Sequence, residues 1–306
     1  MTGTTEAQAL IGQIEAVVQT EIGRNIGALC AAASGGLWSA ATALGTAPAC
    51  RVGLITGFYV PSGAPPAAET DGPVGAALLA RGLVASGIAC RLATDDPCRN
   101  ACAVALAAAG AAAVPVDAAA VGASLAPLID AWRAAGITHA IAIERCGRSA
   151  DGMPRNMRGQ DIAAHTAALD ELFAAGPWDT IAIGDGGNEI GMGALPRDLI
   201  ARHVAMGEAI ACVTPARHLI VAGVSHWGAY ALLGALAVLR RDWRAGMFGA
   251  LDEALDRRVL EATLVDGPAV DGVSRVQAPT IDNLDLGTHH RKLRQIRALA
   301  EGSHAL

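Results

Sequence analysis

The stretch richest in potential chemistry is residues 184–193, which read GDGGNEIGMG. It follows an apolar run, 178–183, whose composition predicts a buried strand. Asp185, Asn188 and Glu189 supply oxygen ligands of the kind that hard cations prefer, and the surrounding glycines allow backbone N–H groups to approach a ligand closely. A sharp turn whose acids merely cap the next helix would give the same pattern. The stretch alone therefore leaves both interpretations open.

Unusual polar side chains also follow three other predicted strands. They are Glu69, Thr70 and Asp71; then Glu144, Arg145, Arg148, Asn156 and Arg158; and finally Ser225, His226 and Trp227. Ligands of open parallel sheets bind at the carboxyl ends of the strands, because the connecting loops gather there. We therefore expect four loops from distant parts of the sequence to line one rim.

The side chains of this rim suit a cation and a small acid. Acids crowded together without a cation would repel one another and raise each other's pKa values. Mg²⁺ or Mn²⁺ fits such an oxygen-rich set, whereas zinc would call for a Cys/His cluster. Arg145, Arg148 and Arg158 are suited to grip a carboxylate or a phosphate, and His226 could exchange protons near neutral pH.

Each of these features also has a purely structural explanation. The acids of 69–71 could form the acidic first turn of a helix. Arg145 and Arg158 could simply neutralise neighbouring acids, and His226 could be a packed histidine beside Trp227. We favour a site, because every structural explanation would have to hold on the same edge of the sheet.

The elements that must position these residues form a regular series. Helices are predicted over 5–22 and 27–44, within an N-terminal segment 1–48. Strands are predicted over 52–60, 90–94, 112–116, 138–144, 178–183 and 218–224, and helices over 75–86, 99–109, 125–135, 162–174 and 229–239. The alternation predicts an α/β fold: a mostly parallel sheet with helices on both faces, three-layered and Rossmann-like.

A single α/β domain over 1–306 is expected from this series. Its core would span 50–240, and a C-terminal segment, 241–306, would return to the site. That segment carries Asp271, Asp282 and His289, whose roles stay open.

Composition narrows the class of partner. The chain is 52% hydrophobic and only 17% charged, as expected of a globular protein. Its formal net charge of −6 argues against general binding of nucleic acid. The longest apolar stretches, such as 229–239, are too short to span a membrane. Seven scattered cysteines and no apparent signal peptide favour reduced thiols in a cytoplasmic protein, with a homo-oligomer left open.

Several motifs, in this order, resemble the family of the D-glutamate cyclase C-terminal domain. They are ITGFYVP (55–61), ETDGP (69–73), AIERCGR (142–148), NMRGQDI (156–162), GDGGNEIGMG (184–193), GVSHWGAYAL (223–232), AVDGV (269–273) and TIDNLDLGTHH (280–290). The resemblance covers about residues 50 to 295. Asn283 stands where the family pattern leads us to expect a glycine.

The resemblance implies an enzyme, a lyase that dehydrates D-glutamate to 5-oxo-D-proline, with a divalent metal, Mg²⁺ or Mn²⁺, at the rim. The expected metal ligands are Glu69, Asp71, Asp185, Asn188 and Glu189. The expected substrate-binding residues are Arg145, Arg148, Asn156, Arg158, Gly186, Gly187 and Ser225, where the glycine N–H groups would stabilise an oxyanion. The expected catalytic residues are His226, Glu144 and Asp185.

Two other functions fit the same residues. A phosphohydrolase dependent on a divalent metal could use the acids, the glycine-rich loop and the arginines on a small phosphate ester. A non-catalytic sensor of small acids would need the pocket but no turnover. Walker, dinucleotide and nucleophile-elbow motifs are missing from the sequence.

Overall fold

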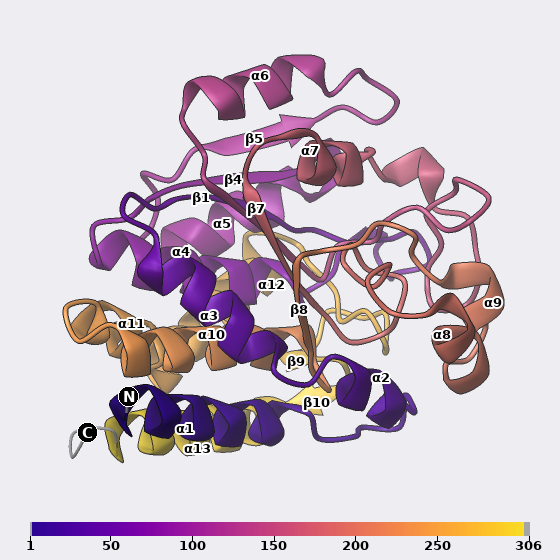
Figure 1. The fold of residues 1–306 in the computed structure, drawn as a ribbon. Coiled ribbons are helices and arrows are strands. Elements are labelled where there is room, and N and C mark those ends of the chain that lie inside the picture. The colour runs from indigo at the N-terminus through magenta and orange to yellow at the C-terminus, as the bar shows by residue number, and fades with distance from the viewer. Residues whose placement is uncertain (1, 303–306) are drawn as a thin grey trace.

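The computed structural model describes residues 2–302 and contains one six-stranded sheet with every neighbouring pair parallel (Figure 1). The strand order is β5-β4-β1-β6-β7-β8. The strands are β1 (Arg51–Ile55), β4 (Ala89–Asp95), β5 (Val116–Ala119), β6 (His139–Ile143), β7 (Asp179–Gly184) and β8 (His218–Val221). This is the doubly wound order in which the chain moves outward from β1 to one edge and then from β6 to the other. The predicted α/β fold with a parallel sheet is confirmed.

Helices cover both faces of the sheet, because side chains alternate along each strand. In β6, Ile141 and Ile143 enter one apolar core while Ala140 and Ala142 enter a second core on the opposite face. The first face carries α1 (Thr2–Val18), α3 (Gly36–Thr46), α4 (Pro73–Ala85), α5 (Arg99–Ala108), α10 (Ser225–Leu239), α11 (Arg244–Ala250), α12 (Glu253–Val265) and α13 (Leu286–Gly302). The second face carries α2 (Gly27–Ala32), α6 (Ala126–Ala134), α7 (Leu169–Ala175), α8 (Arg197–His203) and α9 (Gly207–Ile210).

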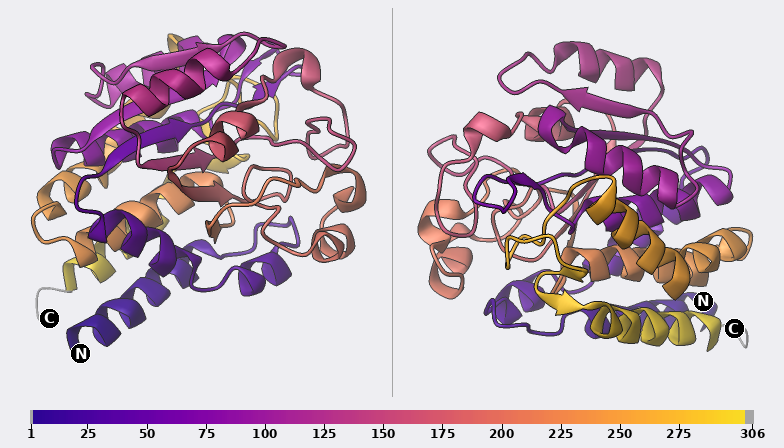
Figure 2. Two further views of the ribbon diagram at one scale, coloured as in Figure 1. Left: turned by 45° about the horizontal axis from the view of Figure 1, so that its top comes forward. Right: turned by 180° about the vertical axis from the view of Figure 1, so that it is seen from behind.

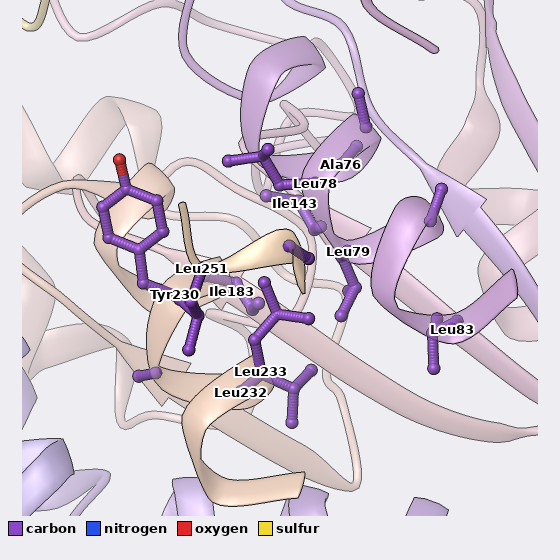
Figure 3. Packing of buried hydrophobic residues seen from close by; sticks show 14 of the residues in the cluster. Ala76, Leu78, Leu79, Leu83, Ile143, Ile183, Tyr230, Leu232, Leu233 and Leu251 are labelled. Atoms are coloured by element: carbon purple, nitrogen blue, oxygen red, sulfur yellow. The ribbon is translucent and has the colours of Figure 1, made fainter. Parts of the chain in front are cut away.

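The core of the first face is built on α4 and α10. Leu78 and Leu79 of α4 belong to the same buried cluster as Leu232 and Leu233 of α10, together with strand residues such as Ile143 (Figure 3). Each buried leucine side chain of this kind contributes about 1.5–3 kcal/mol relative to an exposed position, so burial of these leucines fixes the two helices on the sheet. Their amino-terminal ends therefore hold the loops that precede them in fixed positions.

The first and last helices complete the layer outside α10. Helices α1 and α13 lie side by side, and both pack against α10 (Figures 1 and 2). The loop after α1 and the two-stranded hairpin before α13, β9 (Thr280–Ile281) with β10 (Leu284–Asp285), consequently lie on the same side of the molecule. No helix in residues 2–302 is both long and apolar enough to cross a membrane.

Several predicted boundaries are wrong for identifiable reasons. The strand predicted over 52–60 ends at Ile55, because the chain turns at Gly57, whose φ is +104°. A side chain there would come within 2.4 Å of Thr94 Oγ1, so the turn requires glycine. Beyond it, β2 (Tyr59–Val60) pairs with β3 (Ala67–Ala68) in a separate hairpin.

Three other predicted elements are shifted or divided. The helix predicted over 27–44 is split into α2 and α3 at Gly35, whose φ is +85°. The strand predicted over 112–116 starts only at Val116, because 111–114 form a turn. The helix predicted over 162–174 is divided into a single 3-10 turn, Ala163–His165, and α7. Between them the backbone is extended at Thr166, and the N–H of Ala167 donates to Asp95 Oδ1 at 2.7 Å instead of continuing a helix.

Candidate active site

A pocket of about 290 Å³ lies at the carboxyl ends of β1, β6 and β7, at the point where the strand order reverses. Doubly wound proteins bind ligands at this position. Glu144 and Asp185 line the pocket. Carboxylate oxygens of Asp71, Glu144 and Asp185 lie within 4.8 Å of one another, and all three residues are buried. We call these three residues the acid triad. The prediction that strand-end loops meet at one rim is confirmed for these three loops.

Ser225, the first residue of α10, joins two members of the acid triad. Its backbone N–H donates to Asp185 Oδ2 at 3.0 Å, and its hydroxyl donates to Glu144 Oε2 at 2.5 Å. The helix amino terminus adds a favourable partial positive charge next to both carboxylates. Glu144 itself has a φ of +44°, a conformation that non-glycine residues rarely adopt and that costs on the order of 1–3 kcal/mol. Such strain, held by its surroundings, is typical of functional sites.

The loop after β3 supplies Asp71 of the acid triad and a further acid, Glu69. Asp71 Oδ1 accepts the N–H of Gly72 at 2.7 Å, but its Oδ2 has no hydrogen-bond partner. Glu69 lines the pocket, and its Oε1 is also buried without a partner. Gly72 has a φ of +88°, and a side chain there would lie 2.6 Å from Thr56 Oγ1. Buried polar atoms are nearly always satisfied, so these two oxygens stand out as acceptors that are available to a ligand.

Two residues that the sequence did not mark as site residues complete the pocket. Arg24, in the loop between α1 and α2, forms ion pairs with Asp185 and with Asp282, the latter at 2.5 Å between Nη2 and Oδ1. Asp282 lies in the turn between β9 and β10, where both it and Asn283 have φ near +60°. Asparagine adopts this left-handed conformation more readily than most residues, so Asn283 can replace the glycine expected at this position. The C-terminal segment thus returns to the site through Asp282.

Burial dominates the electrostatics of the pocket. It raises the pKa values of Glu69, Asp71, Glu144, Asp185 and Asp282, and neighbouring carboxylates add to the effect. Arg24 opposes the rise for the last four of them. Five buried carboxylates beside one paired arginine therefore hold protons readily, or bind a cation in their place.

We predict that the cation-free protein loses stability as the pH rises above about 6.5, the ordinary pKa of histidine. Carboxyl groups with a raised pKa bind more protons in the folded than in the unfolded state, so the free energy of unfolding falls as they ionise. Below this range, His139 and His289 act oppositely, because burial lowers their pKa values. Thermal unfolding in chelator would measure the effect. A melting temperature that rises over this interval would contradict it, and added Mn²⁺ should remove the decline.

The glycine-rich loop is organised differently from our prediction. Glu189 Oε1 accepts the N–H groups of Asp185 and Gly186 at 3.0 and 2.6 Å, and its Oε2 accepts that of Gly187 at 2.7 Å. The N–H groups predicted to stabilise an oxyanion are therefore already occupied, and so are the oxygens predicted to bind a metal. Asn188, the other predicted ligand, is buried and donates from Nδ2 to the carbonyl of Arg155 at 2.8 Å. These residues shape the loop that carries Asp185.

Arg145 and Arg148 do not reach the pocket. The guanidinium of Arg145 is buried, forms a two-point ion pair with Asp95, and donates to the carbonyls of Gly57 and Ala167. Arg148 pairs with Asp170 and lines a smaller cavity of about 130 Å³. Both predicted substrate contacts are corrected: these arginines fix the loops on the second face of the sheet.

His226 is likewise engaged elsewhere. Its Nε2 lies 2.9 Å from Asp256 Oδ1, and His290 Nε2 lies 3.0 Å from the other oxygen of Asp256. Burial alone would raise the pKa of Asp256, but His226 and His290 hold it well below its usual range. His289 accepts a hydrogen bond from the indole N–H of Trp227 at 2.8 Å. These contacts join α10, α12 and α13, so the packed-histidine interpretation describes His226 better than the catalytic one.

The rim of the pocket retains two predicted substrate-binding residues. Asn156 Oδ1 accepts the backbone N–H of Arg158 at 3.0 Å and fixes the turn that presents it. Arg158 is exposed, lines the pocket and forms no ion pair with any residue in the range 2–302. Burial and then the nearby Arg275 lower its pKa. Apolar side chains form the adjoining wall: Phe58, Tyr59, Val60, Met157 and Val204.

Fold and site together define the class of protein: a doubly wound α/β protein whose switch-point pocket presents clustered carboxylates and two guanidinium groups. The chain belongs to the D-glutamate cyclase-like, C-terminal family, whose model matches residues 14–297. A relative from Homo sapiens, named D-glutamate cyclase, mitochondrial, is 32% identical over 178 residues. The alignment covers 51% of this chain and 29% of that relative.

Proposed function

We propose that this protein is an enzyme that dehydrates D-glutamate to 5-oxo-D-proline and binds a divalent cation through the acid triad. The observation that carries the proposal is the convergence of three buried carboxylates within 4.8 Å, beside a pocket that Arg158 and Arg24 both line. Family membership supports the reaction. Because the alignment covers less than a third of the human relative, the activity of that whole protein is carried over here only as a proposal.

The residues present suit a hard divalent cation. Asp71, Glu144 and Asp185 offer only oxygen ligands, and the unpartnered Oδ2 of Asp71 is a buried acceptor that needs a partner. Mg²⁺ and Mn²⁺ both prefer such ligands. When bound there, the cation would supply a Lewis acid that polarises a carboxyl group of the substrate.

The remaining groups of the pocket would orient the substrate and move its protons. Arg158, free of ion pairs in the described range, would hold the carboxylate that does not react. The ammonium nitrogen gives up two protons as it forms the bond to the side-chain carbon, and one carboxyl oxygen leaves with two protons as water. Glu69 is placed to carry a proton between them, because it lines the pocket and burial raises its pKa, which favours its protonated form.

The occupied glycine loop weighs against a phosphohydrolase. Phosphate esters are commonly cradled by free backbone N–H groups at a helix amino terminus or in a glycine-rich loop. Here Glu189 occupies the N–H groups of Asp185, Gly186 and Gly187. A small dicarboxylic acid, held by a cation and a guanidinium group, does not need that cradle.

Turnover of D-glutamate by the Mn²⁺-loaded or Mg²⁺-loaded protein tests the proposal. We expect 5-oxo-D-proline to accumulate, detected by chiral chromatography, and to disappear after chelation. L-glutamate and a panel of phosphate esters serve as parallel substrates. Hydrolysis of an ester without any cyclisation would overturn the proposal in favour of a phosphohydrolase, and ligand binding without turnover of any substrate would favour a sensor of small acids.

A further inference from the structure

Arg24 occupies a carboxylate that the proposed cation would need. Its Nη1 pairs with Asp185 Oδ1, while the other oxygen of Asp185 accepts the N–H of Ser225. Both oxygens of Asp185 are therefore engaged within the protein. A cation bound to the acid triad and the guanidinium of Arg24 would compete for the same oxygen atom.

The turn that carries Arg24 is built to place it there. One carboxylate, that of Glu21, accepts the backbone N–H groups of four successive residues, Gly23 to Ile26, at 2.7–2.9 Å. Asn25 has a φ of +61° and donates from Nδ2 to the carbonyl of His203 at 2.7 Å. These bonds fix the backbone on both sides of Arg24, so its entry into the pocket follows from the local structure.

Arg24 also carries the main positive charge near the acids. It is the only arginine or lysine in the described range that forms an ion pair with a carboxylate of the pocket. The other terminal nitrogen of its guanidinium, Nη2, pairs with Asp282 Oδ1 at 2.5 Å. The side chain lines the pocket of about 290 Å³, which gives the guanidinium room to move away from Asp185 while its backbone stays fixed.

We propose that Arg24 is the internal counterion of the acid triad, that a divalent cation displaces it from Asp185, and that the displaced guanidinium then binds a carboxylate of the substrate. The proposal rests on the cation site of the proposed function. It gives Arg24 two opposite effects: the side chain weakens the binding of the cation and strengthens the binding of the acid. It also implies an order of events, in which the cation binds before the substrate.

Calorimetric titration of the metal-free protein with MnCl₂ tests the first effect. We expect Arg24→Gln to bind Mn²⁺ at least about tenfold more tightly than the unmodified protein, because the competitor is gone and its charge no longer opposes the ion. Arg158→Gln is the matched control: it removes the same charge from the rim, away from the triad, and should leave the Mn²⁺ affinity nearly unchanged. Equal affinities in all three proteins, or equal tightening in both variants, would overturn the proposal.

Titration of the Mn²⁺-loaded proteins with D-glutamate tests the second effect, and there Arg24→Gln should bind about tenfold more weakly. If Arg24→Gln does not fold, Arg24→Lys keeps the charge but cannot bridge two carboxylates, and it should show a smaller tightening of Mn²⁺. Absence of Mn²⁺ binding in every variant would sink the proposal. If Arg24→Gln binds Mn²⁺ more tightly but the unmodified protein does not turn over D-glutamate, the counterion role of Arg24 is supported and only the proposed reaction is rejected.

Discussion

Replacing Asp71 by asparagine is expected to weaken the binding of Mn²⁺ by about 100-fold, on a scale where each factor of ten is about 1.4 kcal/mol. The amide oxygen can still accept the N–H of Gly72, so the loop should keep its conformation. The unpartnered Oδ2, however, becomes an amide nitrogen that cannot bind a cation. Turnover should fall by at least as much as occupancy of the site.

The same substitution should stabilise the cation-free protein above neutral pH. Burial and the neighbouring acids raise the pKa of Asp71, so an uncharged side chain of the same shape avoids the cost of ionising it. Asp198→Asn, on the exposed surface of α8, is the control and should change neither quantity. Unaltered calorimetric affinity in Asp71→Asn would show that the cation binds elsewhere.

The second large effect concerns Glu189, whose replacement by alanine should cost about 3 kcal/mol or more of folding stability. Its buried carboxylate accepts three backbone N–H groups of the loop that carries Asp185, and each buried donor left without a partner costs about 1–3 kcal/mol. The folding stability of Glu189→Gln should lie between that of the unmodified protein and that of Glu189→Ala. One acceptor oxygen is retained, but the new amide group faces a backbone N–H donor. Urea unfolding would measure both variants.

Glu208→Gln provides the matched control for Glu189, because this glutamate is exposed and pairs with Arg197 on the surface. We expect its urea midpoint to stay within error of the unmodified protein. If Glu189→Gln instead keeps full stability and loses only Mn²⁺ binding, the carboxylate is a ligand after all and the loop is held by other contacts.

The sequence predicts the rim of the site well, because strand ends are visible in the apolar pattern. Glu144 and Asp185 directly follow β6 and β7, and parallel topology brings such positions together. Arg24 carries no such signal. Its partner Asp282 lies 258 residues further along the chain, and the packing of α1 against α13 brings the loops that carry the two residues to the same side of the molecule.

Side-chain roles were harder to predict than positions. Arg145 lies in a loop whose sequence suggests a binding site, but its guanidinium is neutralised by an ion pair with Asp95. Asp95 lies at the end of β4, where the sequence predicts no site residue. A sequence displays a charge without displaying its partner. Glu189 shows the same limit: its spacing from Asp185 suits a metal ligand and also suits an acceptor for the turn between them, and only the N–H directions distinguish the two.

Helices α1 and α13 pack together although they are synthesised at opposite ends of this sequence, so the order of synthesis decides when their contact can form. All three residues of the acid triad have been synthesised when Asp185 is added after β7. At that point β9 and β10 are still to be synthesised. Until the hairpin and α13 are translated, neither Asp282 is available to Arg24 nor α13 to α1. The three acids of the triad are therefore translated before Asp282, which supplies the second ion pair of Arg24.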